Sequence, residues 1–208
     1  MKKIFFVFFA TGILITSCKE KVGDDDKKAP AAAEMSMPDS ATMMKNWMDY
    51  MTPGEAHALL AKSDGKWTTE STMWMSPDAP PSITTGTSVN RMALGGRYQI
   101  SEHLGNYDGM PFQGISTVGY DNIKKAYIST WVDNFGTGIM VMEGTYDAAT
   151  KTINFKGNMI DPMTKKNTDV RETFQYLDDN TELLEMFMPN PMGEGEFKMM
   201  SLKFTRAK

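Results

Sequence analysis

From Gly65 to the end of the chain, short runs of alternating apolar and polar residues are separated by turn residues. In the last run, Met200, Leu202 and Phe204 occupy every second position, with mostly polar side chains between them. A period of two residues is typical of β-strands that bury one face. The pattern predicts strands at residues 67–75, 83–92, 97–104, 114–120, 126–132, 138–146, 152–159, 170–177, 183–188 and 196–205.

The connections between these strands limit how they can pair. No helical run long enough for a parallel crossover separates them, which favours an antiparallel sheet. Strands with one apolar face must close or stack to remove their free edges, and consecutive connections favour an up-and-down barrel over a sandwich. The centre of the sheet is predicted at residues 111–132, where two strands flank a polar turn at 121–125. The predicted fold class is therefore all-β, an up-and-down antiparallel barrel of about ten strands.

Residues 39–63 follow a helical period instead. Apolar side chains recur every three or four positions, at Met43, Met44, Trp47, Met48 and Met51. Asp39 or Ser40 is the expected N-cap. Thr52 and Pro53 are expected to end this helix, and with Glu55 they predict a capping box for a second short helix. We expect these short N-terminal helices to cover one end of the barrel.

The N-terminus has the three-part organisation of a secretory signal peptide. Lys2 and Lys3 precede an apolar run at residues 4–15, which is too short to span a bilayer as a helix. Residues 15–18, Ile-Thr-Ser-Cys, resemble the bacterial lipobox, after which the signal is cut and the cysteine is acylated. Because Cys18 is the only cysteine, residues 1–17 are predicted to be the signal and Cys18 the lipidation site. A chance cysteine inside an ordinary signal peptide is the alternative.

Residues 18–38 are predicted to be a flexible tether, because they are rich in charge, alanine and proline and poor in large apolar residues. The acidic run at 24–26 is either a solvated spacer or is similar to the export signals of surface lipoproteins in Bacteroidota-type bacteria. We expect the protein to be lipid-anchored to the outer membrane of the cell envelope, on the periplasmic side or the cell surface. The expected domains are then a helical segment at 39–63 and a barrel at 64–208.

The charge balance restricts the expected partners. Removing Lys2 and Lys3 with the signal leaves 20 of the 22 basic residues against 26 acidic ones, a formal charge of −6. This excess argues against nucleic acid as a partner, because phosphate binding requires a clustered basic surface. With no cysteine beyond Cys18, neither a disulfide framework nor thiolate chemistry is available to the mature chain. The fold must therefore be held by its apolar core.

Several blocks of the chain resemble a known family. Gly65-Lys66-Trp67 resembles the Gly-x-Trp start of the first strand in lipocalin-like barrels. More specific blocks are GTSVNRMALGGRY at 86–98, GMPFQGISTVGYD at 109–121, YISTWVDNFGTGIM at 127–140, EGTYD at 143–147 and DPMT at 161–164. Together, from about residue 48 to 206, they resemble the bacterial family DUF1579, a domain of unknown function placed with the calycins. The resemblance implies a lipocalin-like barrel and no established activity.

A barrel of this size has room for a small apolar or amphipathic ligand. Aromatic side chains with a few polar ones are the candidate ligand-binding residues, at Arg97, Tyr98, Tyr120, Tyr127, Trp131, Trp74 and Asp133. Arg97 follows two glycines and either binds a carboxylate ligand or forms a structural salt bridge. Asp133 is either an acid in the pocket or a cap for the glycine-rich turn that follows it.

No metal or other cofactor is expected. His57 and His103 are the only histidines, whereas a zinc site needs three or four ligands. The 20 methionines suit Cu(I), but an adaptable apolar core and a covering helix explain them as well. Glu102 and His103 are neighbours on a strand and point to opposite faces, so they cannot act as a pair. The chain contains no Gly-x-Ser-x-Gly elbow, phosphate loop or dinucleotide fingerprint.

The sequence leaves three functions open, and we expect the first. It is a lipid-anchored barrel that binds a small apolar or amphipathic ligand without catalysis. The second is an enzyme that uses Asp133, Glu143 or Glu172 as acid or base in the same interior. The third is a structural or interaction protein whose barrel is filled by side chains. The contents of the interior distinguish the three.

The lipid anchor gives a first prediction. Cys18→Ala is expected to abolish palmitate incorporation and to release the protein from the membrane fraction, because the thiol that accepts the acyl chain is lost. Metabolic labelling and fractionation of cells measure both effects, with Ser17→Ala, which keeps a small residue before the cysteine, as the matched control. A Cys18→Ala protein that still takes up palmitate and stays in the membrane contradicts the prediction.

Overall fold

The computed structural model describes residues 37–208. Two helices, α1 (Ser40–Met51) and α2 (Glu55–Ala61), precede ten strands. The strands are β1 (Gly65–Met73), β2 (Ser82–Ala93), β3 (Tyr98–Tyr107), β4 (Met110–Asp121), β5 (Ala126–Asp133), β6 (Met140–Asp147), β7 (Thr152–Ile160), β8 (Asn167–Asp178), β9 (Thr181–Pro189) and β10 (Glu196–Arg206). The predicted signal peptide, Cys18 and most of the predicted tether lie outside the described residues.

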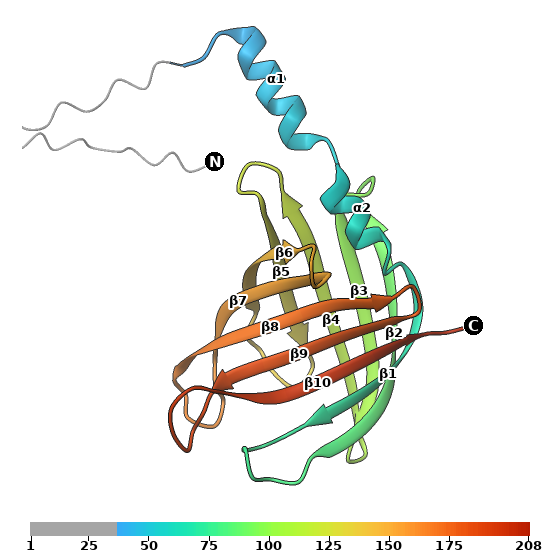
Figure 1. Cartoon of the computed structure of the whole chain (residues 1–208), viewed down its shortest axis with the longest axis vertical. Coiled ribbons are helices and arrows are strands. Elements are labelled where there is room, and N and C mark those ends of the chain that lie inside the picture. The colour runs from blue at the N-terminus through green and yellow to red at the C-terminus, as the bar shows by residue number, and fades with distance from the viewer. Residues whose placement is uncertain (1–36) are drawn as a thin grey trace, which may run out of the picture. The chain divides into compact units, whose positions relative to one another are not determined.

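The strands form one closed antiparallel sheet (Figure 1). Each strand pairs with the next along the chain, and β10 returns to pair with β1, which places Trp67 opposite Arg206. The predicted up-and-down barrel is thereby confirmed. Closure pairs both sides of every strand, so the sheet has no free edge at which another chain could add.

The hairpin of β4 and β5 coincides with the one predicted at residues 111–132. Tyr120 lies opposite Tyr127, and the turn begins at Asp121. The Asp121 carboxylate accepts hydrogen bonds from the backbone N–H groups of Ile123 and Lys124, both at 2.8 Å. Because an aspartate can hold turn backbone in this way, the chain reverses direction at this point.

The N-cap of α1 is the one predicted from the sequence, whereas the N-cap of α2 is not. Asp39 caps α1, and its carboxylate accepts the N–H of Thr42 at 2.9 Å. For α2 the cap is Gly54, whereas Thr52 is the C-cap of α1, so the capping box predicted from Thr52 is wrong. The reason is that Nδ1 of His57 accepts the N–H of Gly54 at 3.0 Å and takes the role expected of an acidic side chain.

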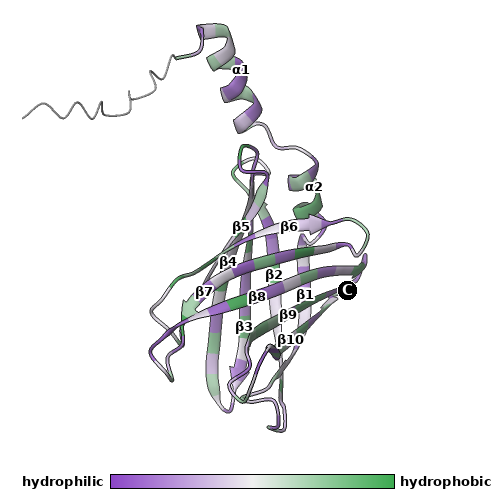
Figure 2. Cartoon of the chain, turned by 60° about the vertical axis from the view of Figure 1, so that its left-hand side comes forward, coloured by the Kyte–Doolittle hydropathy of each residue, from purple (hydrophilic) through white to green (hydrophobic). Residues whose placement is uncertain are grey.

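α2 covers one end of the barrel. Leu60 is buried in the main core, and its carbonyl oxygen accepts a hydrogen bond from Nε2 of Gln99 on β3 at 2.5 Å. Just after the helix, the Ser63 carbonyl accepts from Nε1 of Trp67 at 2.9 Å. Figure 2 shows the strongly hydrophobic colour of α2 beside the strand ends. α1, in contrast, buries no residue, so the expectation that both helices cover the barrel holds for α2 alone.

One cluster of buried side chains joins α2 to the barrel interior. Its members are Leu60, Tyr127, Met142, Ile153, Phe155, Val170, Tyr176 and Met186. Asp39–Lys208 forms one compact unit that contains the whole closed sheet and the helix covering it, so this part of the chain can fold by itself. Within residues 37–208, neither helix is long and apolar enough to cross a membrane.

The position of Leu60 predicts how much α2 contributes to stability. Leu60→Ala is expected to lower the free energy of unfolding by about 2–5 kcal/mol, because it leaves a cavity under the helix. Leu94→Ala, at an exposed turn, is the matched control and is expected to change it by less than about 0.5 kcal/mol. Urea denaturation of residues 37–208 measures both, and equal losses in the two variants would contradict the role of α2 as a cover.

Candidate ligand-binding site

The inward face of β2 and β3 is largely polar, unlike that of an ordinary barrel strand. Most inward positions hold polar or small residues, at Thr84, Gly86, Ser88, Asn90, Gln99, Ser101, His103 and Gly105, and the exceptions are Met92 and Tyr107. The outward face is mixed, because aliphatic Val89 is exposed to water together with charged Arg91 and Glu102. Burying hydroxyl and amide groups while exposing aliphatic side chains lowers stability. The fold alone therefore does not explain this polar interior wall.

Across the barrel, the inward side chains of β7 to β10 are mainly apolar. They include Phe155, Phe174, Leu184, Met186 and Leu202. The interior therefore has one wall of hydroxyl, amide and imidazole groups and one wall of aliphatic, thioether and aromatic groups. Such a lining suits a molecule with both polar and apolar parts.

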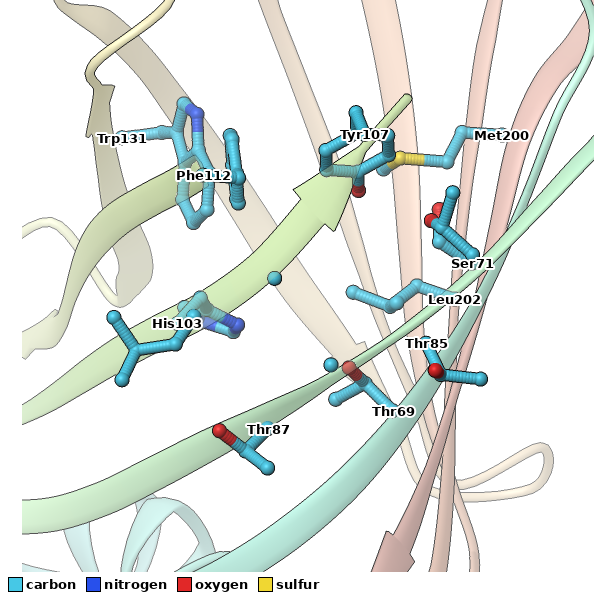
Figure 3. Close-up of a pocket in the computed structure, with 14 residues that line it drawn as sticks. Thr69, Ser71, Thr85, Thr87, His103, Tyr107, Phe112, Trp131, Met200 and Leu202 are labelled. Atoms are coloured by element: carbon cyan, nitrogen blue, oxygen red, sulfur yellow. The ribbon is translucent and has the colours of Figure 1, made fainter. Parts of the chain in front are cut away.

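A cavity of about 80 Å³ lies where the two walls meet (Figure 3). It is formed by the last residues of β1, β3 and β5 and the first of β2, β4 and β10, so it opens at the end of the barrel opposite α2. Its lining consists of Thr69, Ser71, Thr84, Thr85, Gly86, Thr87, His103, Leu104, Gly105, Tyr107, Phe112, Trp131, Met200 and Leu202.

Aromatic rings build one side of the cavity. Trp131 and Phe112 are stacked with ring centroids 6.2 Å apart, and Tyr107 meets Phe112 edge-on at 5.1 Å. Gly114 makes this arrangement possible, because a Cβ atom there would lie 2.4 Å from the indole of Trp131. The glycine in this block thus provides the space in which the tryptophan lies across β4.

His103 lies between the aromatic side and the apolar wall. Its ring meets Trp131 at 5.2 Å and Phe204 at 6.1 Å between centroids, both edge-on. Burial lowers the pKa of His103 to about 4, because the charged imidazolium loses its hydration. At neutral pH the imidazole is therefore uncharged, with one N–H donor and one nitrogen acceptor.

Ser71 supplies a polar group to the cavity. Its side chain is 4% exposed, and within the described part of the chain its hydroxyl has no hydrogen-bond partner. Some other polar groups of the interior are paired: Ser88 Oγ donates to Asn90 Oδ1 at 2.8 Å, and Nε2 of Gln99 donates to the Leu60 carbonyl of α2. Oε2 of Glu182, deeper in the barrel, also has no partner within residues 37–208. A buried hydroxyl without a partner is costly, so a group entering the cavity would satisfy it.

Asp133 connects the cavity wall to the loop after β5. One carboxylate oxygen accepts from Nε1 of Trp131 at 2.7 Å. The other accepts from the backbone N–H groups of Phe135 and Gly136, at 2.9 and 3.0 Å. The same aspartate therefore orients the indole and caps the glycine-rich turn, and the cap is one of the two roles considered for it. The other role, an acid in the pocket, stays a prediction.

Two buried acids lie deeper in the barrel. Glu172 on β8 stands between Phe155 and Met186 in the register, and burial raises its pKa to about 8. Burial also raises the pKa of Glu182 to about 7, although the hydroxyl of Ser63 donates to it at 2.5 Å and opposes the shift. Near neutral pH Glu172 is therefore mostly a protonated, uncharged acid.

The structure distributes the seven candidate residues over three places. Trp131 lines the cavity, and Asp133 accepts a hydrogen bond from its indole N–H. Tyr120 and Tyr127 lie inside the barrel but near α2, where their rings meet each other at 4.9 Å and Tyr127 belongs to the core. The remaining three, Arg97, Tyr98 and Trp74, do not line the cavity.

These three residues have contacts of their own. The Arg97 guanidinium donates to the backbone carbonyls of Leu94 and Met51, at 3.0 and 2.7 Å, rather than to a carboxylate. Tyr98 lies over Gly119, where a Cβ atom would be 2.7 Å from its ring. Trp74 lies beyond the end of β1, with the Lys198 ammonium 5.6 Å from its ring centroid.

The acids considered for catalysis do not converge. Glu143 is exposed and pairs with Lys124 on the outside of the barrel. Glu102 is exposed while its neighbour His103 faces inward, as the strand period requires. Among residues 37–208, no three His, Cys, Asp or Glu side chains lie close enough to hold a metal ion together.

Sequence reasoning missed Ser71, Phe112 and the site role of His103. Phe112 belongs to the block at 109–121 and follows the inward period of β4, so its position could have been found from the strand register. Ser71 shares the inward period of Trp67 on β1 in the same way. Ser71 and His103 were passed over because polar residues on a strand are expected to face water.

The fold and the cavity define the class of protein: a lipocalin-like, closed antiparallel barrel with an amphipathic interior. A family model described as a protein of unknown function (DUF1579) matches residues 52–206. The chain belongs to this family. No curated protein matches it in sequence.

Solved structures support the fold. The crystal structure of Rv2717c from M. tuberculosis matches with a TM-score of 0.54 and 13% identity, covering 76% of this chain and 100% of that one. The S-type phycobiliprotein lyase CPES from Guillardia theta matches with a TM-score of 0.52 and 9% identity, over 78% of this chain and 97% of that one. At these identities the likeness concerns the barrel alone.

Glu172 predicts how stability depends on pH. Unfolded, this carboxyl releases its proton near 4.5, whereas the folded protein keeps it up to about 8. The folded state therefore binds the extra proton between these values, and the free energy of unfolding falls as pH rises through the window. Glu172→Gln is expected to remove this dependence and to exceed the original protein in stability at pH 9 by up to about 5 kcal/mol.

Denaturant titrations at pH 5, 7 and 9 measure this effect. Glu70→Gln, at an exposed position of β1, is the matched control and is expected to leave the pH profile unchanged. If Glu172→Gln and the original protein lose stability in parallel from pH 5 to 9, the buried, uncharged state of Glu172 is refuted.

Proposed function

We propose that this protein binds a small amphipathic molecule in the cavity between the polar and apolar walls of its barrel, and that it does so without catalysis. The observation that carries the proposal is the buried Ser71 hydroxyl, which lines the cavity with His103 and has no partner among the described residues. A buried polar group is costly unless something pairs with it. A ligand with a hydroxyl or carbonyl group would provide that pairing at Ser71 and His103.

The lining indicates the chemical class of the ligand. The rings of Trp131 and Phe112 offer faces and edges for an aromatic or flat apolar group. Neutral His103 both donates and accepts, and Ser71 does the same, so an uncharged polar group is preferred over an ion. No Lys or Arg side chain lines the cavity to balance an anion.

The size of the cavity limits what can enter. Because one water molecule takes up about 30 Å³ in the liquid, a volume of about 80 Å³ holds an end group rather than a whole drug-sized ligand. The rest of a longer molecule would lie at the mouth, where Phe135 meets Phe112 at 5.3 Å between centroids. The ligand we propose therefore has a compact polar and aromatic head.

We also propose where in the cell the protein lies. The lipobox-like residues before Cys18 support a lipid anchor in the cell envelope, as inferred from the sequence. The barrel would then act as a binding protein held at a membrane. A barrel whose small cavity is merely a packing defect is the second candidate, and the small volume favours it over an enzyme.

A pair of probes tests the binding function. Phenol and toluene have similar shapes, but only phenol carries a hydroxyl. Residues 37–208 are expected to bind phenol more tightly than toluene by about tenfold, and Ser71→Ala is expected to remove most of that preference. Calorimetric titration measures both affinities.

A second variant separates binding from folding. In Gly105→Ala the nearest neighbours of the added methyl are Phe112 and the Thr85 carbonyl, at 3.8–3.9 Å, so it narrows the cavity without a clash. It is expected to weaken phenol binding by about tenfold, whereas Gly138→Ala, with nothing within 4 Å, leaves binding unchanged. If neither probe binds, and native mass spectrometry of the purified protein finds no retained molecule, the barrel is a filled, structural one.

A further inference from the structure

α1 is an amphipathic helix whose apolar half is exposed. Met44 is 63% exposed and Trp47 is 61% exposed, and the helix buries no residue. The apolar half consists of Met43, Met44, Trp47, Met48, Tyr50 and Met51. An exposed apolar surface of this extent on a soluble fold indicates a contact with something else.

The other half of α1 is polar and electrically balanced. Lys45 and Asp49 are one turn apart and pair with each other at 2.5 Å, and Thr42 lies beside them on this half. Figure 2 shows the resulting bands of hydrophilic and hydrophobic colour along the helix. An electrically balanced polar half means that burial of the apolar half, rather than attraction between charges, would drive binding.

The barrel fixes the last turn of α1. Nδ2 of Asn122, in the turn between β4 and β5, donates to the carbonyls of Asp49, Tyr50 and Thr52 at 2.8–3.1 Å. Arg97, in the turn between β2 and β3, donates to the carbonyl of Met51. These bonds use only backbone carbonyls at the end of α1 as acceptors, so they hold the helix without engaging its apolar side chains.

The two turns that hold α1 carry exposed apolar residues of their own. Leu94 is 73% exposed and Ile123 is 72% exposed. Leu94 accepts a bond from Arg97, and Ile123 follows Asn122 directly, so both lie beside the residues that cap α1. The exposed apolar surface therefore extends from the helix to two hairpin tips at the same end of the barrel.

We propose that α1, with Leu94 and Ile123, docks on the surface of the lipid bilayer. The inference rests on the proposed lipid anchor in one respect: the anchor brings α1 close to a membrane. Only 21 residues separate Cys18 from Ser40. At about 3.4 Å per extended residue this segment reaches no more than about 75 Å, so the anchor keeps α1 at high effective concentration near the membrane. Interfacial helices of this kind bury Met, Trp and Tyr at the boundary between headgroups and acyl chains.

Docking by α1 has a consequence for the cavity. The cavity opens at the end of the barrel opposite α2, whereas Asn122 and Arg97 hold α1 at the end of β4 and the start of β3, which is the α2 end. Docking through α1, Leu94 and Ile123 therefore turns the cavity mouth away from the bilayer. The ligand would then enter from the aqueous side and not from the lipid.

A fluorophore on each half of the helix tests the proposal. Residues 37–208 contain no cysteine, so Met48→Cys and Lys45→Cys can each be labelled with a nitrobenzoxadiazole dye at one position. With vesicles of phosphatidylethanolamine and phosphatidylglycerol at millimolar lipid, the dye at position 48 is expected to brighten by about twofold or more as it enters the apolar boundary. The dye at position 45, on the polar half of the same helix, is expected to change little.

Other outcomes overturn the proposal. Equal responses at the two positions, or none at 48, exclude docking through the apolar half. Brightening at 48 that grows with protein concentration in the absence of vesicles shows that a second copy covers the helix instead. The labelled protein, residues 37–208, lacks Cys18, so these results do not depend on acylation. The lipid anchor is tested separately, by the palmitate labelling of Cys18→Ala.

Discussion

Closure of the sheet is the constraint on which the rest of the structure depends. β1 and β10 are the first and last strands, yet they pair along seven consecutive positions from Trp67 to Met73. This pairing of distant segments encloses an interior that α2 seals at one end through Leu60 and Gln99. Without it, Ser71 on β1 and Leu202 on β10 would not face each other across adjacent strands, and no cavity would form between them.

This enclosure buries polar side chains as well as apolar ones. Most inward residues on β2 and β3 are polar or small, while aliphatic Val89 faces water. Buried, uncharged forms of His103 and Glu172 follow from the same enclosure, because an ion loses its hydration there. A barrel selected for stability alone would have more apolar side chains on the inward face of these strands. This local conflict with the rules that form the fold is what supports the proposed binding site.

The sequence predicted the fold better than the site, for a physical reason. The period of two residues and the turn chemistry around Asp121 depend only on neighbours along the chain, and they were enough to place all ten strands. The second helix cap was missed because His57 replaced the expected acid. Arg97 and Tyr98 lie outside the cavity, while Ser71 and His103 face it, because strand register and not residue chemistry decides which side chains point inward. On β3 the exposed side chains include both Leu104 and Glu102, and the inward ones include both His103 and Tyr107, so polarity alone did not show which residues face the interior.

The double role of Asp133 has a consequence for how the barrel would respond to an occupant. One of its oxygens holds the indole of Trp131, and the other holds the loop backbone at Phe135 and Gly136. The cavity wall and the mouth loop therefore share a single carboxylate, and a change in the position of one alters the free energy of the other. If the proposed ligand moves the indole, it therefore also changes the free energy of the loop. By thermodynamic reciprocity, a partner that moves the loop would then change the affinity for the ligand by the same factor as the ligand changes the affinity for the partner.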